Sequence, residues 1–263
     1  MRKYDTLLVE EPHPGVLLVT LNRPEVSNAF NTQMGYDLFD VFHPLELEHR
    51  KYRCVVITGA GQKAFCAGGD LKERNTLTEE QWVLQHELFE RTFRHVLNCP
   101  LPVIAAVNGA AVGGGLELML LCDFAYASRT ARFALTEVSL GIMPGGGGTQ
   151  TLARVAGERR AKEIILTASP FTAEEALQWG IVNRLFDPEE VLPKTLEAAC
   201  RIASNAPISV RQAKHSIHYG LQMDLTSGMM FEIEAYQRMV HSEDRKEGVR
   251  AFNEKRKPVF QGK

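Results

Sequence analysis

The chain has 263 residues, of which 44% are apolar and 24% charged, which is typical of a globular protein long enough to bury a large core. Its formal net charge of -2 excludes a strong overall field that would attract nucleic acid or an anionic membrane. An anionic ligand must therefore be held by local groups.

The five cysteines are scattered, odd in number and without a CxxC pair, which predicts reduced structural thiols at Cys54, Cys66, Cys99, Cys122 and Cys200. The N-terminal residues contain no apolar segment of signal-peptide length, and no later stretch has the roughly 20 apolar residues that cross a bilayer. We therefore expect a cytoplasmic protein with no membrane partner.

The first elements in chain order are a hairpin, a helix and a strand. Residues 6–10 and 15–21 are apolar runs on either side of a Pro-Gly turn, which predicts a β-hairpin. From Asn31 onward apolar side chains recur at helical spacing, and Pro44 should shorten or kink that helix. The apolar run at residues 54–58 indicates a buried strand.

The middle of the chain alternates helices with short apolar strands, an order that favours parallel pairing. The expected strands are 103–107, 124–127 and 182–186, and the expected helices are 79–97, 113–121, 158–167 and 173–179. From residue 188 onward the pattern is helical, with interruptions at Pro207, near Asp224 and near Ser242. This predicts a C-terminal helical layer.

A glycine cluster in the segment GAAVGGGLEL, residues 109–118, starts an otherwise apolar helix. The first N–H groups of a helix have no partner within it and carry the positive end of its dipole, so bare glycine backbone there can stabilise an anionic oxygen. Tight helix packing is the commoner reason for such glycines. Glu117 favours a functional site over packing alone, because a carboxyl group in the first turn of an apolar helix is expected to be buried, which is costly for a charged group.

A second carboxyl group, Glu137, lies between a strand-like segment and the glycines 145–148. Alone it would be interpreted as a helix cap or a surface charge. Two carboxyl groups beside glycine-rich loops can position one water, deprotonate it and deliver a proton elsewhere.

Three motifs, AFCAGGDLKE, AAVNGAAVGGGLEL and TEVSLGIMPGGGGTQTL, follow one another in an order and spacing that resemble the crotonase superfamily, closest to its enoyl-CoA hydratases. The resemblance extends from LNRPEVSNAFN near the start to AFNEKRKPVF near the end. It implies an α/β fold with a spiral of ββα-like units in residues 1–200, which hold the active site. It also implies a C-terminal helical region, 201–263, for trimerisation and active-site cover, in a homotrimer or dimer of trimers.

The resemblance further implies a reaction, the reversible addition of water to a 2-enoyl-CoA to give 3-hydroxyacyl-CoA. Glu117 and Glu137 would be the catalytic pair. The N–H groups of Gly69 and Gly114 would form the oxyanion hole for the thioester carbonyl, and Gly145 would help to hold the water. No metal or redox cofactor is expected, because coenzyme A is part of the substrate.

In this family coenzyme A runs along loops whose positions here are Ala29, Ala67, Asp70, Leu71 and Lys72. Many relatives carry a basic residue beside the asparagine of the first motif, whereas this chain has Glu25, Val26 and Ser27 there. Candidates for contact with the CoA phosphates are instead Arg23, Lys72, Lys255 and Lys257, each of which could equally be a solvated surface charge. Thr136, Met143 and Gly146 lie at variable positions that could reshape the acyl pocket.

Other classes of protein fit the sequence less well. Neither glycine cluster matches G-x-G-x-x-G, since the last position falls on Leu118 or Gln150, and the serine hydrolase, zinc protease and P-loop motifs are absent from the sequence. His215 and His218 share a helix face but have no further ligands in the pattern, so no metal site is expected. Dispersed basic residues argue against nucleic-acid binding. The alternative that stays open is an enoyl-CoA isomerase or another crotonase-type acyl-CoA lyase or hydrolase.

Overall fold

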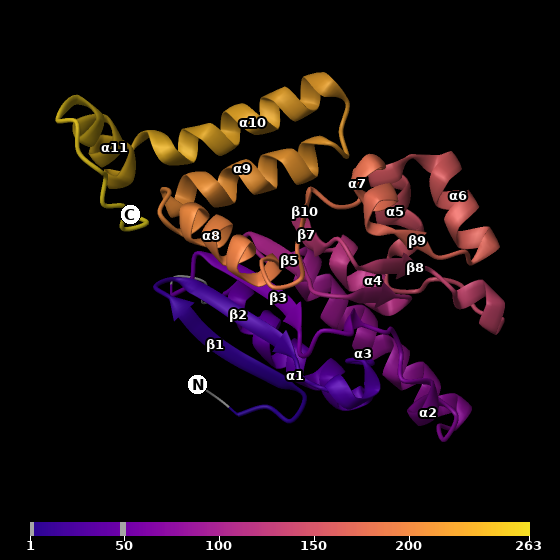
Figure 1. The fold of residues 1–263 in the computed structure, drawn as a ribbon. Helices are drawn as coiled ribbons and strands as arrows, with labels where there is room; N and C mark the ends of the chain where they lie inside the picture. The colour runs from indigo at the N-terminus through magenta and orange to yellow at the C-terminus, as the bar shows by residue number, and fades with distance from the viewer. Residues whose placement is uncertain (1–2, 48–50) are drawn as a thin grey trace.

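The structure is a computed structural model that describes residues 3–47 and 51–263, within which the chain forms two β-sheets surrounded by helices (Figure 1). The larger sheet contains, in spatial order, β1 (Leu7–His13), β2 (Val16–Leu21), β3 (Cys54–Gly59), β5 (Val103–Val107), β7 (Phe124–Ser128) and β10 (Arg184–Phe186). The smaller sheet contains β4 (Ala64–Cys66), β6 (Ala110–Val112), β8 (Arg132–Ala134) and β9 (Phe171–Thr172). The hairpin β1–β2 and the pair β8–β9 are antiparallel, and the other pairs are parallel.

Six of the eleven α-helices in the described residues begin after a residue whose side chain caps them, namely α1, α2, α3, α7, α10 and α11. The α-helices are α1 (Thr32–Phe42), α2 (Leu71–Arg74), α3 (Glu79–Leu97), α4 (Gly114–Leu120), α5 (Gly148–Ala156), α6 (Glu158–Thr167), α7 (Ala173–Gln178), α8 (Val191–Ala203), α9 (Pro207–Gly220), α10 (Leu225–Val240) and α11 (Glu243–Asn253). Short 3₁₀ turns are η1 (Pro24–Val26), η2 (His43–Glu46) and η3 (Glu137–Leu140). The predicted interruptions at Pro207, Asp224 and Ser242 prove to be helix starts, because proline suits the first turn and Asp224 and Ser242 accept backbone N–H bonds as N-caps.

The chain passes repeatedly from the larger sheet to the smaller one and then into a helix. This occurs through β3, β4 and α2, through β5, β6 and α4, and through β7, β8 and η3. The predicted spiral of ββα-like units is therefore confirmed. The expected coenzyme A loop with Ala67, Asp70, Leu71 and Lys72 follows β4 and includes the first residues of α2, because the Asp70 side chain caps that helix. Strand β4 is too short to show a periodic pattern and is stabilised by neighbouring backbone of the smaller sheet.

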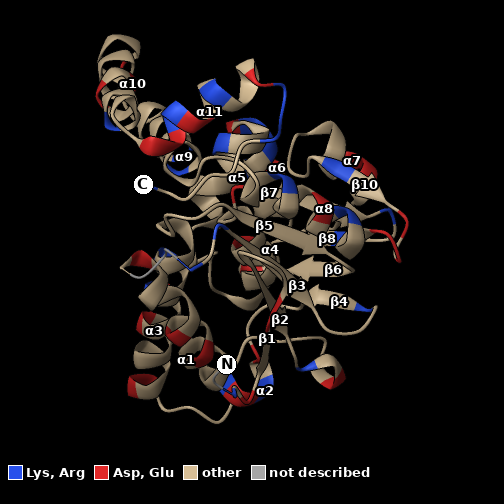
Figure 2. Cartoon of the chain, turned by 90° about the vertical axis from the view of Figure 1, so that its left-hand side faces the viewer, with Lys and Arg blue, Asp and Glu red and all other residues tan. Residues whose placement is uncertain are grey.

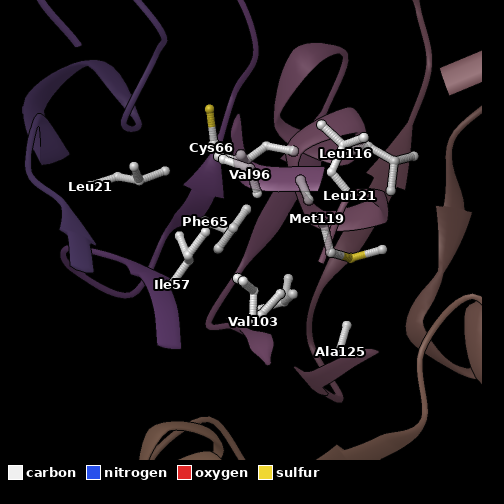
Figure 3. Close-up of a cluster of buried hydrophobic side chains, with 14 of the residues drawn as sticks. Leu21, Ile57, Phe65, Cys66, Val96, Val103, Leu116, Met119, Leu121 and Ala125 are labelled. Atoms are coloured by element: carbon white, nitrogen blue, oxygen red, sulfur yellow. The ribbon is translucent and has the colours of Figure 1, made fainter. Parts of the chain in front are cut away.

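The strands of the larger sheet are buried on both faces, which is why their sequences are continuously apolar. In β3, Val55 and Ile57 point into the core cluster that includes Phe65 of the smaller sheet, whereas Cys54 and Val56 point toward α8. Figure 3 shows Ile57, Phe65, Val103 and Met119 gathered in the first of these clusters. Each buried aliphatic side chain of this size contributes about 1.5–3 kcal/mol, so the core fixes the strands from which the site residues extend.

The C-terminal helices form a layer of their own beyond α8. Helix α8 packs on the larger sheet, and α9 and α10 lie side by side (Figure 1). The boundary expected at residue 200 falls within α8, and the division into two regions stays a prediction. All five cysteines are free, as predicted, and Cys54, Cys66 and Cys99 are buried. In the described part of the chain, none of the helices combines the length and the apolar character that a bilayer crossing requires.

Candidate active site

The site lies where three strands of the smaller sheet end. Strands β4, β6 and β8 are parallel neighbours, so their carboxyl ends meet at one edge of the sheet. Gly69 follows β4, Gly114 follows β6 and Glu137 follows β8. The topology thereby brings together three residues that are far apart in the sequence.

Gly69 and Gly114 present backbone N–H groups on neighbouring turns. A Cβ atom placed on Gly114 would lie 4.0 Å from the nitrogen of Gly69. The bridge between Phe30 and Gly69 uses the Gly68 carbonyl and the Asp70 N–H, at 2.7 and 3.0 Å, and does not use the N–H of Gly69. Gly114 is the first residue of α4, so its N–H has no partner within the helix. Both N–H groups can therefore donate to a ligand oxygen.

The close approach of α4 to β4 requires glycine. A Cβ atom on Gly115 would lie 2.1 Å from the carbonyl oxygen of Cys66, closer than any side-chain carbon can come. Gly113 has a φ of +54°, which is disfavoured for residues with a side chain. Packing is thus one real reason for this glycine cluster, and it also sets the position of the Gly114 N–H.

Glu117 is 4% exposed and is held by the loop before α5 and by the first residue of that helix. Its Oε1 accepts hydrogen bonds from the N–H groups of Gly146 and Gly148, both at 2.8 Å. Burial raises the pKa of Glu117 to about 6, and the negative charge of Glu137 acts in the same direction, while the two N–H bonds and Arg74 oppose the shift. The carboxyl group is therefore able to exchange a proton near neutral pH.

Glu137 begins η3 and is 9% exposed. Among the described residues its Oε2 has no hydrogen-bond partner, although the atom is buried. Its Oε1 lies 3.1 Å from the position that a Cβ on Gly113 would occupy. Burial raises the pKa of Glu137, while its own backbone N–H and the charge of Arg74 lower it. A buried acceptor without a protein donor is suited to bind a ligand proton.

A cavity of about 430 Å³ joins these groups, a size suited to a small-molecule site. Its lining includes Gly69, Gly114, Glu117, Glu137 and Gly145. The lining also includes the three positions expected to shape an acyl pocket, Thr136, Met143 and Gly146. The sequence-predicted glutamates and glycines are thus brought into one cavity, and their chemical roles stay predictions.

One wall of the cavity comes from α3, which sequence reasoning did not connect with the site. Trp82, His86, Phe89 and Phe93 line the cavity from positions spaced by three or four residues, so they share one face of the helix. Arg74, the last residue of α2, lies against this wall, with its guanidinium 4.6 Å from the Trp82 ring centre. Only the folded chain shows these contacts, since α3 has the pattern of any amphipathic helix.

The residues expected to bind coenzyme A are only partly at the cavity. Ala67 and Leu71 line it, whereas Ala29, Asp70 and Lys72 lie outside its lining. The Asp70 carboxylate caps α2 and pairs with Arg23 at 2.9 Å, and Arg23 also donates to the carbonyl of Ala29. Arg23 is thus already engaged, and contact with coenzyme A stays a prediction for all five residues.

The chain is similar to known proteins over nearly its whole length. A family model described as enoyl-CoA hydratase/isomerase matches residues 11–263. The chain is 41% identical to a short-chain-enoyl-CoA hydratase of Clostridium acetobutylicum, over 95% of each chain, and 37% identical to a crotonyl-CoA hydratase of Syntrophomonas wolfei, over 98% of each. Among solved structures, an enoyl-CoA hydratase from Bacillus anthracis superposes with a TM-score of 0.96 at 42% identity, covering 98% of this chain and all of the other.

Proposed function

Because the chain belongs to the enoyl-CoA hydratase/isomerase family, a family of enzymes, we propose that it adds water across the 2,3-double bond of a 2-enoyl-CoA to give a 3-hydroxyacyl-CoA. The observation that carries this proposal is the placement of Glu117 and Glu137 in one cavity with the N–H groups of Gly69 and Gly114. The relatives named as crotonyl-CoA and short-chain-enoyl-CoA hydratases support hydration over other reactions of the family, and a short acyl chain.

The two glycine N–H groups would bind the thioester carbonyl oxygen. When the hydroxyl adds at carbon 3, negative charge moves to that oxygen as an enolate, so donors aimed at it stabilise the transition state more than the substrate. The start of α4 directs its helix dipole toward the same place. Removing one such donor typically costs about 10²–10³ in rate.

The two glutamates would share one water. One carboxylate takes a proton from the water while the oxygen of the water bonds to carbon 3. The other carboxyl group delivers a proton to carbon 2. We assign these roles to the pair jointly, because the charge of Glu137 raises the pKa of Glu117 and the two groups face one cavity. The N–H bonds from Gly146 and Gly148 orient Glu117, and the backbone of neighbouring Gly145 would contact the water. This chemistry requires no metal or redox cofactor.

The test is turnover of crotonyl-CoA, followed as loss of the absorbance of the conjugated double bond. We predict that Glu117→Gln and Glu137→Gln each lower kcat by about 10²–10⁴, because each removes an acid or base while keeping side-chain shape. The matched control is Glu163→Gln, an exposed glutamate of α6 that should leave turnover unchanged. Product analysis would distinguish a 3-hydroxyacyl-CoA from a shifted double bond.

Near-wild-type turnover in either glutamine variant would refute the paired mechanism. If a panel of enoyl-CoA thioesters is isomerised or cleaved but never hydrated, the chain is an isomerase or another acyl-CoA lyase or hydrolase of the family. That result would leave the oxyanion hole in place and change only the proton transfers.

The substrate and a second copy of the chain are the partners we propose. Lys72, Lys255 and Lys257 are exposed and remain candidates for the CoA phosphates, since Arg23 is paired with Asp70. Helices α9 and α10 and the turn between them carry large exposed apolar side chains, among them Leu221, Leu225, Met230 and Ile233. Such a surface is typical of a subunit interface and supports a homo-oligomer, a trimer or a dimer of trimers.

A further inference from the structure

Arg74 is a charged residue in the cavity that the hydration mechanism does not use. Its side chain is half-buried and lines the cavity together with both glutamates. Within the described residues, no carboxylate lies within salt-bridge distance of its guanidinium, and its Nε donates one hydrogen bond, to Oε1 of Gln85 at 3.0 Å. Its two terminal amino groups have no acceptor in that part of the protein. A half-buried guanidinium with free donors needs an anion to compensate its lost hydration.

The surroundings hold Arg74 in a fixed orientation. Its guanidinium carbon lies 4.6 Å from the ring centre of Trp82 and 5.7 Å from that of Phe89. Gln85, which accepts from Arg74, also donates to Glu73 at 2.9 Å and is 4% exposed. Two aromatic rings and a buried amide thus fix the orientation of the Arg74 guanidinium, as expected for a binding group and not for a mobile surface charge.

Among the described residues, none of the four nearby carboxylates, Glu73, Glu90, Glu117 and Glu137, forms a salt bridge with Arg74. Glu73 accepts hydrogen bonds from the N–H of Thr32 and from Gln85, both at 2.9 Å. Glu90, which also lines the cavity, forms an ion pair with Arg94. Glu117 and Glu137 influence Arg74 only through the longer-range attraction of their charges. The two terminal amino groups of the Arg74 guanidinium are therefore available to a ligand.

We propose that Arg74 binds a carboxylate at the far end of the acyl chain, so that the preferred substrates are short 2-enoyl-CoA thioesters that carry a terminal carboxylate. This inference rests on the proposed hydratase function and names its substrate class. A planar guanidinium with two free amino groups matches a carboxylate in a bidentate pair, which a neutral acyl chain cannot offer.

The position of Arg74 sets the length of the chain it can recognise. Its guanidinium carbon lies 3.3 Å from the position of a Cβ on Gly69, so by standard backbone dimensions it is within about 6 Å of the Gly69 nitrogen. That nitrogen is the proposed donor to the thioester oxygen. The carboxylate must then lie only a few carbons from the thioester, as it does in a five-carbon chain.

The experiment compares two five-carbon substrates that differ in the carboxylate. Glutaconyl-CoA carries a carboxylate at carbon 5, and 2-pentenoyl-CoA has a methyl group there. We expect the wild-type enzyme to hydrate both, with kcat/KM higher for glutaconyl-CoA by about 10- to 100-fold, the range for a hydrogen-bonded charged group. This comparison needs no variant and is independent of any folding defect.

Variants then assign the preference to Arg74. Arg74→Met should lower kcat/KM for glutaconyl-CoA by about 10²-fold, mainly through KM, because it removes one partner of a charge pair. Because loss of the Arg74 charge also raises the pKa of Glu117 and Glu137, the readout is the ratio of kcat/KM for glutaconyl-CoA to that for 2-pentenoyl-CoA, which should fall to about 1. A thermal unfolding transition like that of the wild type shows that the variant is folded. Arg74→Lys should retain part of the preference. Arg91→Met, at an exposed arginine of α3, is the control and should change neither value.

Three outcomes would overturn the inference. Equal or better turnover of 2-pentenoyl-CoA by the wild type would refute carboxylate recognition and leave the hydratase proposal intact. An equal loss on both substrates in Arg74→Met would mean that Arg74 acts on the glutamate pair and not on the acyl chain. If neither these thioesters nor crotonyl-CoA is hydrated, both the proposed function and the inference that rests on it are refuted.

Discussion

At the scale of single residues, Glu117 is subject to two opposing influences. Burial favours its protonated form, whereas hydrogen bonds from Gly146 and Gly148 favour the carboxylate, and the result is a pKa of about 6 against the usual 4.5. The folded protein therefore binds this proton more tightly than the unfolded chain does. This group contributes stability below about pH 4.5 that is lost as the pH rises through about 6.

A consequence is that Glu117→Gln should stabilise the fold while it abolishes most activity. Glutamine keeps the acceptor for both N–H groups and removes the buried charge, so at pH 8 the free energy of unfolding should rise by up to about 2 kcal/mol. At pH 4.5 the difference should largely vanish. Urea unfolding at both pH values, at one protein concentration, measures this effect. Glu189→Gln, an exposed control, should change the free energy of unfolding by less than about 0.5 kcal/mol. A variant less stable than wild type at pH 8 contradicts this reasoning.

The two glutamates could be selected from the sequence, but Arg74 could not. Glu117 interrupts an apolar helix and Glu137 lies beside a glycine cluster, so each is conspicuous within its own segment. Arg74 ends the polar segment LKER, which has the composition of a solvated turn. Its burial comes from contact with Trp82 and Gln85 of α3, and a single segment carries no signal of such tertiary contact.

At the scale of elements, the position of α4 depends on how closely it approaches β4. The Gly115 backbone lies so near the Cys66 carbonyl that no side-chain carbon can fit between them. Because Gly114 starts the same helix, a shift of α4 would also move its N–H away from that of Gly69. Packing and the proposed oxyanion hole are therefore coupled.

We predict that Gly115→Ala destabilises the protein and impairs catalysis together. Overpacking of a tight site typically costs about 1–3 kcal/mol, and displacement of one oxyanion donor should lower kcat for crotonyl-CoA by about 10²-fold. Thermal unfolding and steady-state kinetics provide the two measurements. Gly220→Ala is the matched control, since its new Cβ would have no contact closer than 4.0 Å and alanine favours the helical conformation. Full activity in Gly115→Ala would show that α4 can move without consequence.

Prediction from the sequence worked for elements with a long pattern. The helix 79–97 and the strand 103–107 have the expected bounds, because one has three-residue and four-residue apolar spacing and the other is buried on both faces. The three-residue strands β4, β6 and β8 were not predicted, since they are too short for any period and form only against one another. The site lies at the ends of these strands, so its geometry required the fold.

At the scale of the whole molecule, charge and apolar surface are distributed differently. Figure 2 shows acidic and basic residues interspersed along elements such as α11, in keeping with the net charge of -2. Large exposed apolar side chains are concentrated on α9, α10 and the turn between them, where Leu221 and Leu225 are each 80% exposed. Along α10, Met229, Ile233 and Tyr236 recur at helical spacing on an exposed face. This surface would be costly in contact with water.

The corresponding prediction is that a charge on this face separates the subunits. Ile233→Glu, alone or with Met230→Glu, should convert the proposed homo-oligomer to monomer, because burial of an unpaired carboxylate in an apolar interface is costly. Sedimentation velocity over a range of protein concentrations measures the change in mass. Leu166→Glu makes the same substitution at an exposed leucine of α6 and should leave the mass unchanged. A wild-type protein that sediments as a monomer, or an Ile233→Glu variant that still assembles, would place the subunit contact elsewhere or exclude it. The site residues come from strands and helices before α9, so the monomer should retain the cavity even if α10 no longer finds a partner.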